Sequence, residues 1–268
     1  MNVDDPQWYR RAIFYEVLVR GFNDSSGDGT GDLRGVTEKL DYLEWLGIDC
    51  LWLLPFYESP LADGGYDISD FFSVHPDYGT VGDAAELIDE AHRRGMRVIA
   101  DMVMNHTSDQ HPWFQESRQS RTNPRADWYV WNDDNDRWAE ARVIFVDTEP
   151  SNWTWEPGRQ QYYWHRFFHH QPDLNFDNPD VADAMIDVVR YWLNLGLDGF
   201  RLDAVPHMIE RDATHWNDQP ESRALTKRLQ DAIKGYPGRY VVCEATAQPQ
   251  AYGDPAVCGG AFAFGHVH

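Results

Sequence analysis

The chain has 268 residues and 42% hydrophobic content, which is enough for one large domain with a sizeable core. Its formal net charge is −21, with 44 acidic against 23 basic residues, and this argues against nucleic acid and anionic membranes as partners. The N-terminal residues carry no basic, apolar leader and no apolar run approaches about 18 residues, so we expect no membrane span and a cytoplasmic location.

Short apolar runs alternate with segments of helical period in the first part of the chain. Leucine spacing predicts a helix over 35–46. Asp83 and Glu86 form a candidate capping box for a second helix, which would end at Gly95. Strands are predicted on either side of these helices, at 12–19, 50–54 and 97–103.

The alternation resumes further along the chain. Asn178 and Pro179 supply a cap and a first-turn proline for a helix that Gly196 closes. A further helix is predicted at 221–233, and strands at 197–202 and 239–243. Strands and helices that alternate at this spacing predict a parallel sheet, either open and doubly wound or closed as a barrel.

Residues 107–172 interrupt this pattern. They are rich in Trp, Asn, Asp and Pro and show no helical period. The stretch is too long for a plain loop in a compact domain, so we expect a small inserted subdomain after the third strand.

The cysteines do not suggest a disulfide framework. There are three, and Cys50 and Cys243 lie in apolar, strand-like runs, where we expect buried reduced thiols. Cys258 lies outside any predicted element.

Two predicted strands end in a carboxylate. Asp203 follows an apolar run at 199–202, and Glu244 follows another at 241–243. Parallel strands would bring both acids to one pocket, and glycosidic-bond chemistry requires such a pair. Arg201 points to the same side as Asp203 and would keep that carboxyl ionised. A buried structural ion pair is the alternative interpretation.

Polar motifs occupy Gly65 to Asp67 and Asp101 to His106, at or after predicted strands, and Gln171 to Asn175, before a predicted helix. Together with Gly199 to Asp203 and Glu244, they resemble the α-amylase superfamily of retaining glycosidases and transglycosidases, which implies a (β/α)8 TIM barrel. The sequence QPDLN resembles the oligo-1,6-glucosidase branch. Finer features at 145–149, 151–155, 162–168 and 203–206 resemble the members that interconvert maltose and trehalose.

The resemblance implies retaining, intramolecular transglucosylation through a covalent glucosyl-enzyme, with maltose, trehalose and glucose as substrates. Asp203 would be the nucleophile, and Glu244 the acid and base, with a pKa above that of Asp203. Asp101 would support the pocket. The same carboxylates would serve an α-glucosidase or oligo-1,6-glucosidase, which is the alternative activity. The implied substrate-binding residues are Tyr66, Asp67, His106, Phe145, Phe167 and Gln171.

The resemblance further implies structural Ca²⁺ at one or two sites and no organic cofactor. In the first site, oxygen-bearing residues alternate with glycines, although Ser26 stands where the family usually has Asn. An acidic, glycine-rich turn is the alternative there, and ordinary surface acids are the alternative at the second site. The first site comprises Asp24, Ser26, Asp28, Thr30 and Asp32, and the second comprises Asn105, Asp173 and Glu210 with the backbone carbonyls of His207 and Met208.

Five strands are predicted, whereas the implied barrel needs eight, so we expect a barrel truncated after about the fifth strand. The family's third catalytic carboxylate, an Asp preceded by His, has no counterpart in the sequence. A non-catalytic, sugar-binding remnant is therefore a third interpretation, and an open edge favours homo-oligomers. We expect barrel parts at 1–106 and 173–245, a lid subdomain at 107–172 and an atypical tail at 246–268.

Overall fold

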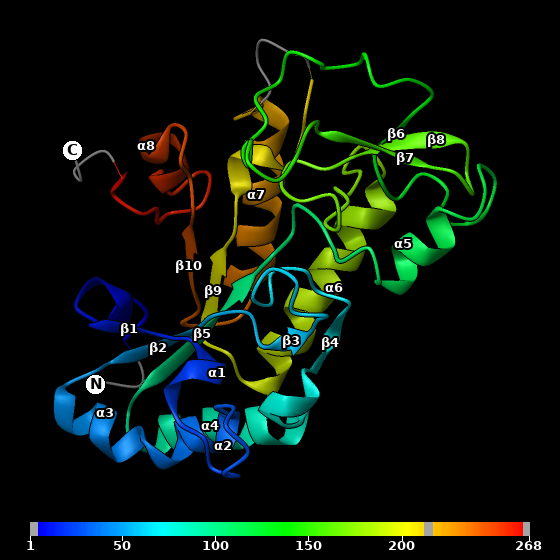
Figure 1. Ribbon diagram of the computed structural model, residues 1–268. Coiled ribbons are helices and arrows are strands. Elements are labelled where there is room, and N and C mark those ends of the chain that lie inside the picture. Colours follow the sequence, from blue (N-terminus) through cyan, green and yellow to red (C-terminus); the bar gives the residue numbers. More distant parts are fainter. Residues whose placement is uncertain (1–4, 212–216, 265–268) are drawn as a thin grey trace.

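The computed structural model in Figure 1 describes residues 5–211 and 217–264. Within them, one parallel sheet has the strand order β1-β2-β5-β9-β10, so each strand pairs with the next parallel strand along the chain. A doubly wound sheet would reverse its order at a switch point, whereas a barrel wall does not. The strands are β1 (Phe14–Val17), β2 (Cys50–Leu53), β5 (Arg97–Met102), β9 (Gly199–Leu202) and β10 (Tyr240–Cys243).

The helices form the outer layer of this partial barrel (Figure 1). Side chains alternate along each strand: Leu202 and Val241 join the helices in the main core, whereas Trp52 and Val242 lie on the other face, beside Trp8. No helix in the described ranges is long and apolar enough to cross a membrane. The helices outside the insert are α1 (Val19–Phe22), α2 (Leu33–Glu38), α3 (Leu40–Leu46), α4 (Val81–Arg93), α6 (Pro179–Leu195), α7 (Pro220–Lys234) and α8 (Pro249–Gly253), with short 3₁₀ turns at Trp8–Arg10, Pro76–Tyr78 and Val205–His207.

The five predicted strands are confirmed, but two helix predictions were wrong in detail. The helix expected over 35–46 is divided into α2 and α3, which meet at Lys39. The cap of α4 is Thr80, whose side chain accepts from the backbone of Asp83 while the Asp83 carboxylate accepts in return. Asp83 is thus the N3 residue of the capping box rather than its N-cap residue.

A hairpin between the second and third strands of the sheet was not predicted. It consists of β3 (Tyr57–Glu58) and β4 (Asp70–Val74), which pair antiparallel. Trp192 of α6 donates from Nε1 to the Phe71 carbonyl over 2.8 Å, which fixes the hairpin to the helical layer. The hairpin carries the loop that contains Tyr66.

The segment after β5 has its own small sheet, in the order β6-β8-β7, and a separate aromatic cluster of Trp138, Trp153 and Trp164. The two ends of this inserted segment lie side by side, where the Thr107 amide donates a hydrogen bond of 3.3 Å to the Pro172 carbonyl. Figure 1 shows this segment and α8 at the same end of the large sheet. Its elements are α5 (Pro112–Ser117), β6 (Trp131–Asn132), β7 (Trp153–Glu156) and β8 (Gln161–Trp164).

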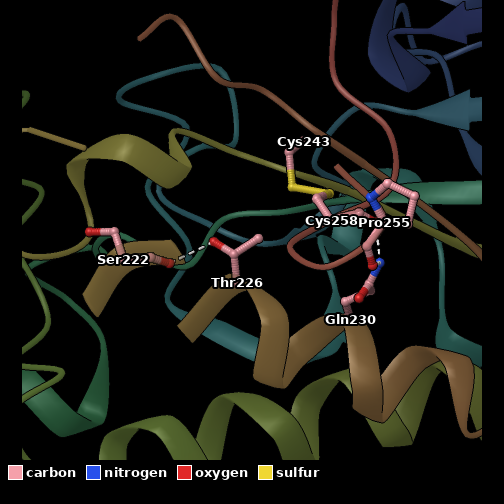
Figure 2. Close-up of a disulfide and its surroundings, with 6 residues drawn as sticks. All are labelled: Ser222, Thr226, Gln230, Cys243, Pro255 and Cys258. Carbon is pink, nitrogen blue, oxygen red and sulfur yellow. Dashed lines mark hydrogen bonds between the residues drawn. A yellow bond between two sulfur atoms is a disulfide. The ribbon is translucent and has the colours of Figure 1, made fainter. Parts of the chain in front are cut away.

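The expectation that Cys243 is a reduced thiol was wrong. Cys243 forms a disulfide with Cys258, drawn in Figure 2, whereas Cys50 is a buried free thiol as expected. The pairing arises because the chain turns back after α8 and runs beside β10, where Ala261 forms a parallel bridge with Cys243. Spacing along the sequence gives no sign of this return.

His111 provides a test of the insert's dependence on pH. Its Nδ1 caps α5 by accepting from the Trp113 amide, and burial lowers the pKa of His111 from 6.5 to about 3. The neutral ring is therefore the form that the fold stabilises. The contribution of neutral His111 to the free energy of unfolding is complete above pH 6.5. It is lost as the pH falls toward 3, at about 1.4 kcal/mol per pH unit.

His111→Asn keeps a side chain that can cap the helix but removes the titrating group. We therefore expect the free energy of unfolding, measured in urea from pH 7 to pH 4, to depend less steeply on pH, by the contribution of one proton. Measurements between pH 7 and pH 8 serve as the reference, because both proteins should have the same slope there. An unchanged slope below pH 6.5 would contradict the assignment.

Candidate active site

Three carboxyl groups converge on Arg201 at the end of the parallel sheet. Its Nη1 lies 2.5 Å from an oxygen of Asp101 and 2.5 Å from one of Asp203, and its Nη2 lies 3.2 Å from Glu244. The acids come from β5 and from the residues that directly follow β9 and β10. Glu244 also accepts a hydrogen bond of 3.0 Å from the Ala204 amide. The two acids selected from the sequence therefore share one guanidinium, and Asp101 is a third member.

The electrostatics of this cluster differ from the expectation. Burial raises the pKa of Asp203 well above its ordinary value even though Arg201 lowers it, and Asp101 and Glu244 raise it further. Burial likewise raises the pKa of Asp101 to about 6. Burial raises the pKa of both Asp101 and Asp203, so the single Arg201 guanidinium does not fully compensate these two buried carboxyls, and they titrate as a coupled pair.

Two aromatic side chains support the cluster. Trp52 donates from Nε1 to Asp101 over 2.9 Å, and the Arg201 guanidinium carbon lies 5.5 Å from the centre of the Trp52 ring. The Tyr66 hydroxyl lies 3.4 Å from Asp101. Sequence reasoning missed Trp52, because its period-2 position on β2 is equally typical of core packing.

A cleft of about 390 Å³ opens beside Glu244, within the size range of small-molecule sites. The insert supplies Arg142, Ile144 and Phe167 to its lining. Phe167 packs edge-on against His106, with ring centres 5.3 Å apart. The remaining lining residues are Ala204, His207, Asn217, Glu244, Thr246 and Ala247.

His106 and Phe145 lie around the Phe167 ring. His106 makes a 3.2 Å contact from Nε2 to the Tyr66 carbonyl, and burial lowers the pKa of His106 to about 4, so its ring is neutral at pH 7. Phe145 is 37% exposed and stacks on Phe168, with ring centres 4.3 Å apart. The insert thus brings aromatic rings over the His106 side of the site.

Asp67 and Gln171 form contacts within the surrounding loops. The Asp67 carboxylate accepts from the Ala62 and Asp63 amides and from the Ser59 hydroxyl. Gln171 is buried and donates from Nε2 to Asp63 over 2.8 Å, which joins the end of the insert to the Tyr66 loop. Asp63 was not predicted from the sequence.

In the loop at 24–32, the acids bind backbone and hydroxyl groups. Asp24 accepts from the amides of Ser26, Gly27 and Gly29. Asp28 accepts from the Thr30 amide, and Asp32 caps α2 and bonds to Ser25. Across the part of the chain that is described, no group of three or more His, Cys, Asp or Glu side chains is arranged to hold a metal ion.

The second predicted cation site has a different donor set. The Oδ1 of Asn105 and both carboxylate oxygens of Glu210 are buried without a hydrogen-bond partner. Asp173 is buried beside them and accepts from the Arg166 amide over 3.0 Å, and the Arg166 side chain lies 3.8 Å from Glu210. His207 and Met208 are also buried, in the segment after β9. Unpartnered buried oxygens of this kind fit a hard cation such as Ca²⁺.

The partial barrel and the carboxylate cluster agree with the family that the sequence motifs suggested. Residues 16–266 match the family described as "Alpha amylase, catalytic domain", and the chain belongs to this family. Members of the family often bind calcium.

The curated proteins that this chain resembles include trehalose synthases. The chain is 60% identical over 260 residues to trehalose synthase/amylase TreS of Mycolicibacterium smegmatis, covering 95% of this chain and 44% of that protein. It is 58% identical over 247 residues to the trehalose synthase of Pimelobacter sp., covering 92% and 43%. The chain therefore spans less than half the length of these relatives.

A solved structure agrees in fold. Trehalulose synthase MutB from Pseudomonas mesoacidophila superposes with a TM-score of 0.83 and 37% identity, covering 88% of this chain and 45% of that one. The superposition supports the assignment of the five-stranded sheet as part of a barrel.

Replacement of Arg201 by Gln tests the carboxyl cluster. Arg201 contacts all three acids, so its removal leaves buried negative charge uncompensated, and we expect a loss of about 3–5 kcal/mol in the free energy of unfolding at pH 7. The loss should shrink toward pH 4, where the carboxyls bind protons. Urea unfolding at both pH values measures it.

Arg190→Gln is the matched control. Arg190 forms an exposed pair with Asp187, with 57% and 68% of the two side chains accessible. Its replacement should change the free energy of unfolding by less than about 0.5 kcal/mol at either pH. An Arg201→Gln variant as stable as this control would refute the role of Arg201.

Proposed function

We propose that the chain belongs to an enzyme that interconverts maltose and trehalose by intramolecular transfer of a glucosyl group. The observation that carries the proposal is the convergence of Asp203 and Glu244 on Arg201, beside a cleft that Phe167 helps to line. The similarity to trehalose synthases supports the choice of substrates. Retaining glycosidic chemistry needs two adjacent carboxyl groups with different tasks.

In the first step, the Asp203 carboxylate attacks the anomeric carbon of the non-reducing glucose. Glu244 donates a proton to the departing O4, so the glycosidic bond breaks and a covalent glucosyl-enzyme forms. Arg201 stabilises the ionised form of Asp203 that must react.

In the second step, the released glucose turns within the cleft and presents its anomeric hydroxyl. Glu244 removes the proton of that hydroxyl, and the oxygen attacks the glucosyl-enzyme to give trehalose. We assign Tyr66, His106 and Gln171 to the walls of the glucose site, with Asp67 holding the Tyr66 loop. Phe145 and Phe167, from the lid at 107–172, would exclude water that would otherwise hydrolyse the intermediate.

Hydrolysis as an α-glucosidase or oligo-1,6-glucosidase is the second candidate, because the same carboxylates would serve it with water as acceptor. The half-exposed Phe145 favours this candidate, since a lid that admits water permits hydrolysis. The balance between the two products therefore depends on closure of the insert rather than on the acids.

Product analysis tests the proposal. We expect the enzyme that contains this chain to convert maltose into trehalose with a minor yield of free glucose. Asp203→Asn and Glu244→Gln should each lower kcat by a factor of about 10²–10⁴. Release of glucose without any trehalose would favour hydrolysis. Asp187→Asn, at an exposed surface pair, is the control and should retain full activity.

We also propose a structural Ca²⁺ held by Asn105, Asp173 and Glu210, with the carbonyls of His207 and Met208. The support is the buried, unpartnered oxygen of Asn105 and the two of Glu210. The ion would join the insert to the segment after β9 and offset the buried negative charge. The loop at Asp24, Ser26, Asp28, Thr30 and Asp32 is a weaker site, because its carboxylates already accept hydrogen bonds from the chain.

Thermal unfolding with and without chelator tests the ion. We expect EDTA to lower Tm and added Ca²⁺ to restore it, with a shift that grows with the ratio of free ion to Kd. Glu210→Gln should abolish this response, whereas Asp24→Asn should leave most of it. A Tm that is insensitive to Ca²⁺ in the unmodified protein would contradict the second site.

A further inference from the structure

The Cys243–Cys258 disulfide lies directly beside the proposed acid and base. Cys243 is the last residue of β10, and the next residue is Glu244. Both cysteines are buried, with 0% and 1% exposure, on the helix side of the sheet. Because side chains alternate along a strand, Cys243 points toward the helices while Glu244 points toward the cleft.

The disulfide closes a loop that forms part of the cleft. Cys243 and Cys258 are separated by 15 residues. Glu244, Thr246 and Ala247, which line the cleft, all lie inside this closed loop. The position of the loop therefore sets one wall of the substrate site.

The tail beyond Cys258 fits closely against β10. The Cys243 amide donates to the Gly260 carbonyl over 2.9 Å, and the Phe262 amide donates to the Cys243 carbonyl over 3.3 Å. A Cβ at Gly260 would lie 2.8 Å from the Tyr240 hydroxyl, so glycine is needed for this approach. The disulfide thus holds a segment in the position of a further parallel strand.

Two further contacts bind the tail to the molecule. Gln230 of α7 is buried and donates from Nε2 to the carbonyls of Cys258 and Pro255, over 2.6 and 3.2 Å; Figure 2 shows Gln230, Cys258 and Pro255 beside the disulfide. On the other side, the Phe262 ring lies 5.5 Å from that of Trp52, which supports Asp101 and Arg201. The tail therefore reaches the carboxyl cluster by two routes, through Glu244 and through Trp52.

We propose that Cys243 and Cys258 form a redox-controlled latch that holds Glu244 and the adjoining cleft wall in position when oxidised and releases them when reduced. Its importance for catalysis rests on the function proposed above. The reductant is a low-molecular-weight dithiol. The Sγ–Sγ bond breaks as the dithiol gives up two electrons and two protons, leaving two protein thiols and a cyclic disulfide.

Reduction should loosen the tail by a measurable factor. Closure of a 15-residue loop contributes ~3 kcal/mol in the chain-entropy account, which corresponds to about a 100-fold change in the equilibrium for detachment. After reduction, the contacts of the tail with β10, Gln230 and Trp52 still oppose its detachment, but no covalent bond holds the tail in place. Oxidation restores the closed loop.

The test uses the 268-residue chain in oxidised form and after treatment with dithiothreitol without denaturant. Alkylation followed by mass measurement should find one reactive thiol after denaturation of the oxidised protein and three after reduction. Hydrogen exchange should then accelerate by up to about 100-fold at the amides of Cys243, Phe262 and Ala204. Ala204 reports on Glu244 because its amide donates to that carboxylate. Amides of β5, which pairs with two strands, should not change.

Cys258→Ser should reproduce the reduced pattern without reductant, whereas Cys50→Ser, at the buried free thiol, should keep the oxidised pattern. If Cys258→Ser fails to fold, the comparison of oxidised and reduced wild-type protein decides the matter. Three thiols in protein exposed to a disulfide oxidant, resistance to the dithiol, or acceleration at Phe262 without any at Ala204 would each overturn the latch. None of these measurements needs turnover, so failure of the proposed activity would be seen separately.

Discussion

Arg201 carries one positive charge into a site where Asp101, Asp203 and Glu244 meet. All three acids lie at the end of adjacent parallel strands, so the sheet itself fixes their spacing. Burial makes it costly to ionise both Asp101 and Asp203, and one guanidinium offsets only part of that cost.

The alternation of side chains along β9 and β10 divides the molecule into two functional layers. Phe200 and Leu202 bind the sheet to its helices, while Arg201 points inward with Asp203. The β3–β4 hairpin and the insert then approach the inner face from outside the barrel wall, and the Gln171–Asp63 bond joins them.

The strands and the central acids could be predicted because they depend on local patterns: an apolar run, a terminal carboxylate and an arginine two residues earlier. Trp52 was missed because an inward aromatic residue on a strand has the same pattern as core packing. Cys258 was missed because its partner is chosen by the path of the tail, which no spacing rule encodes. The two-residue strand β3 is too short to have a period, and its pairing comes from packing against α6.

Thr107 and Pro172 remain within hydrogen-bonding distance although 64 residues separate them. For the barrel, the whole insert is therefore equivalent to a short connection. The entropic cost of closing this long loop is offset by the insert's own sheet and aromatic cluster. An insert closed in this way can differ in length without moving the ends of β5 and α6. Its shape is constrained only where it contacts the rest of the molecule, as at the bond from Gln171 to Asp63.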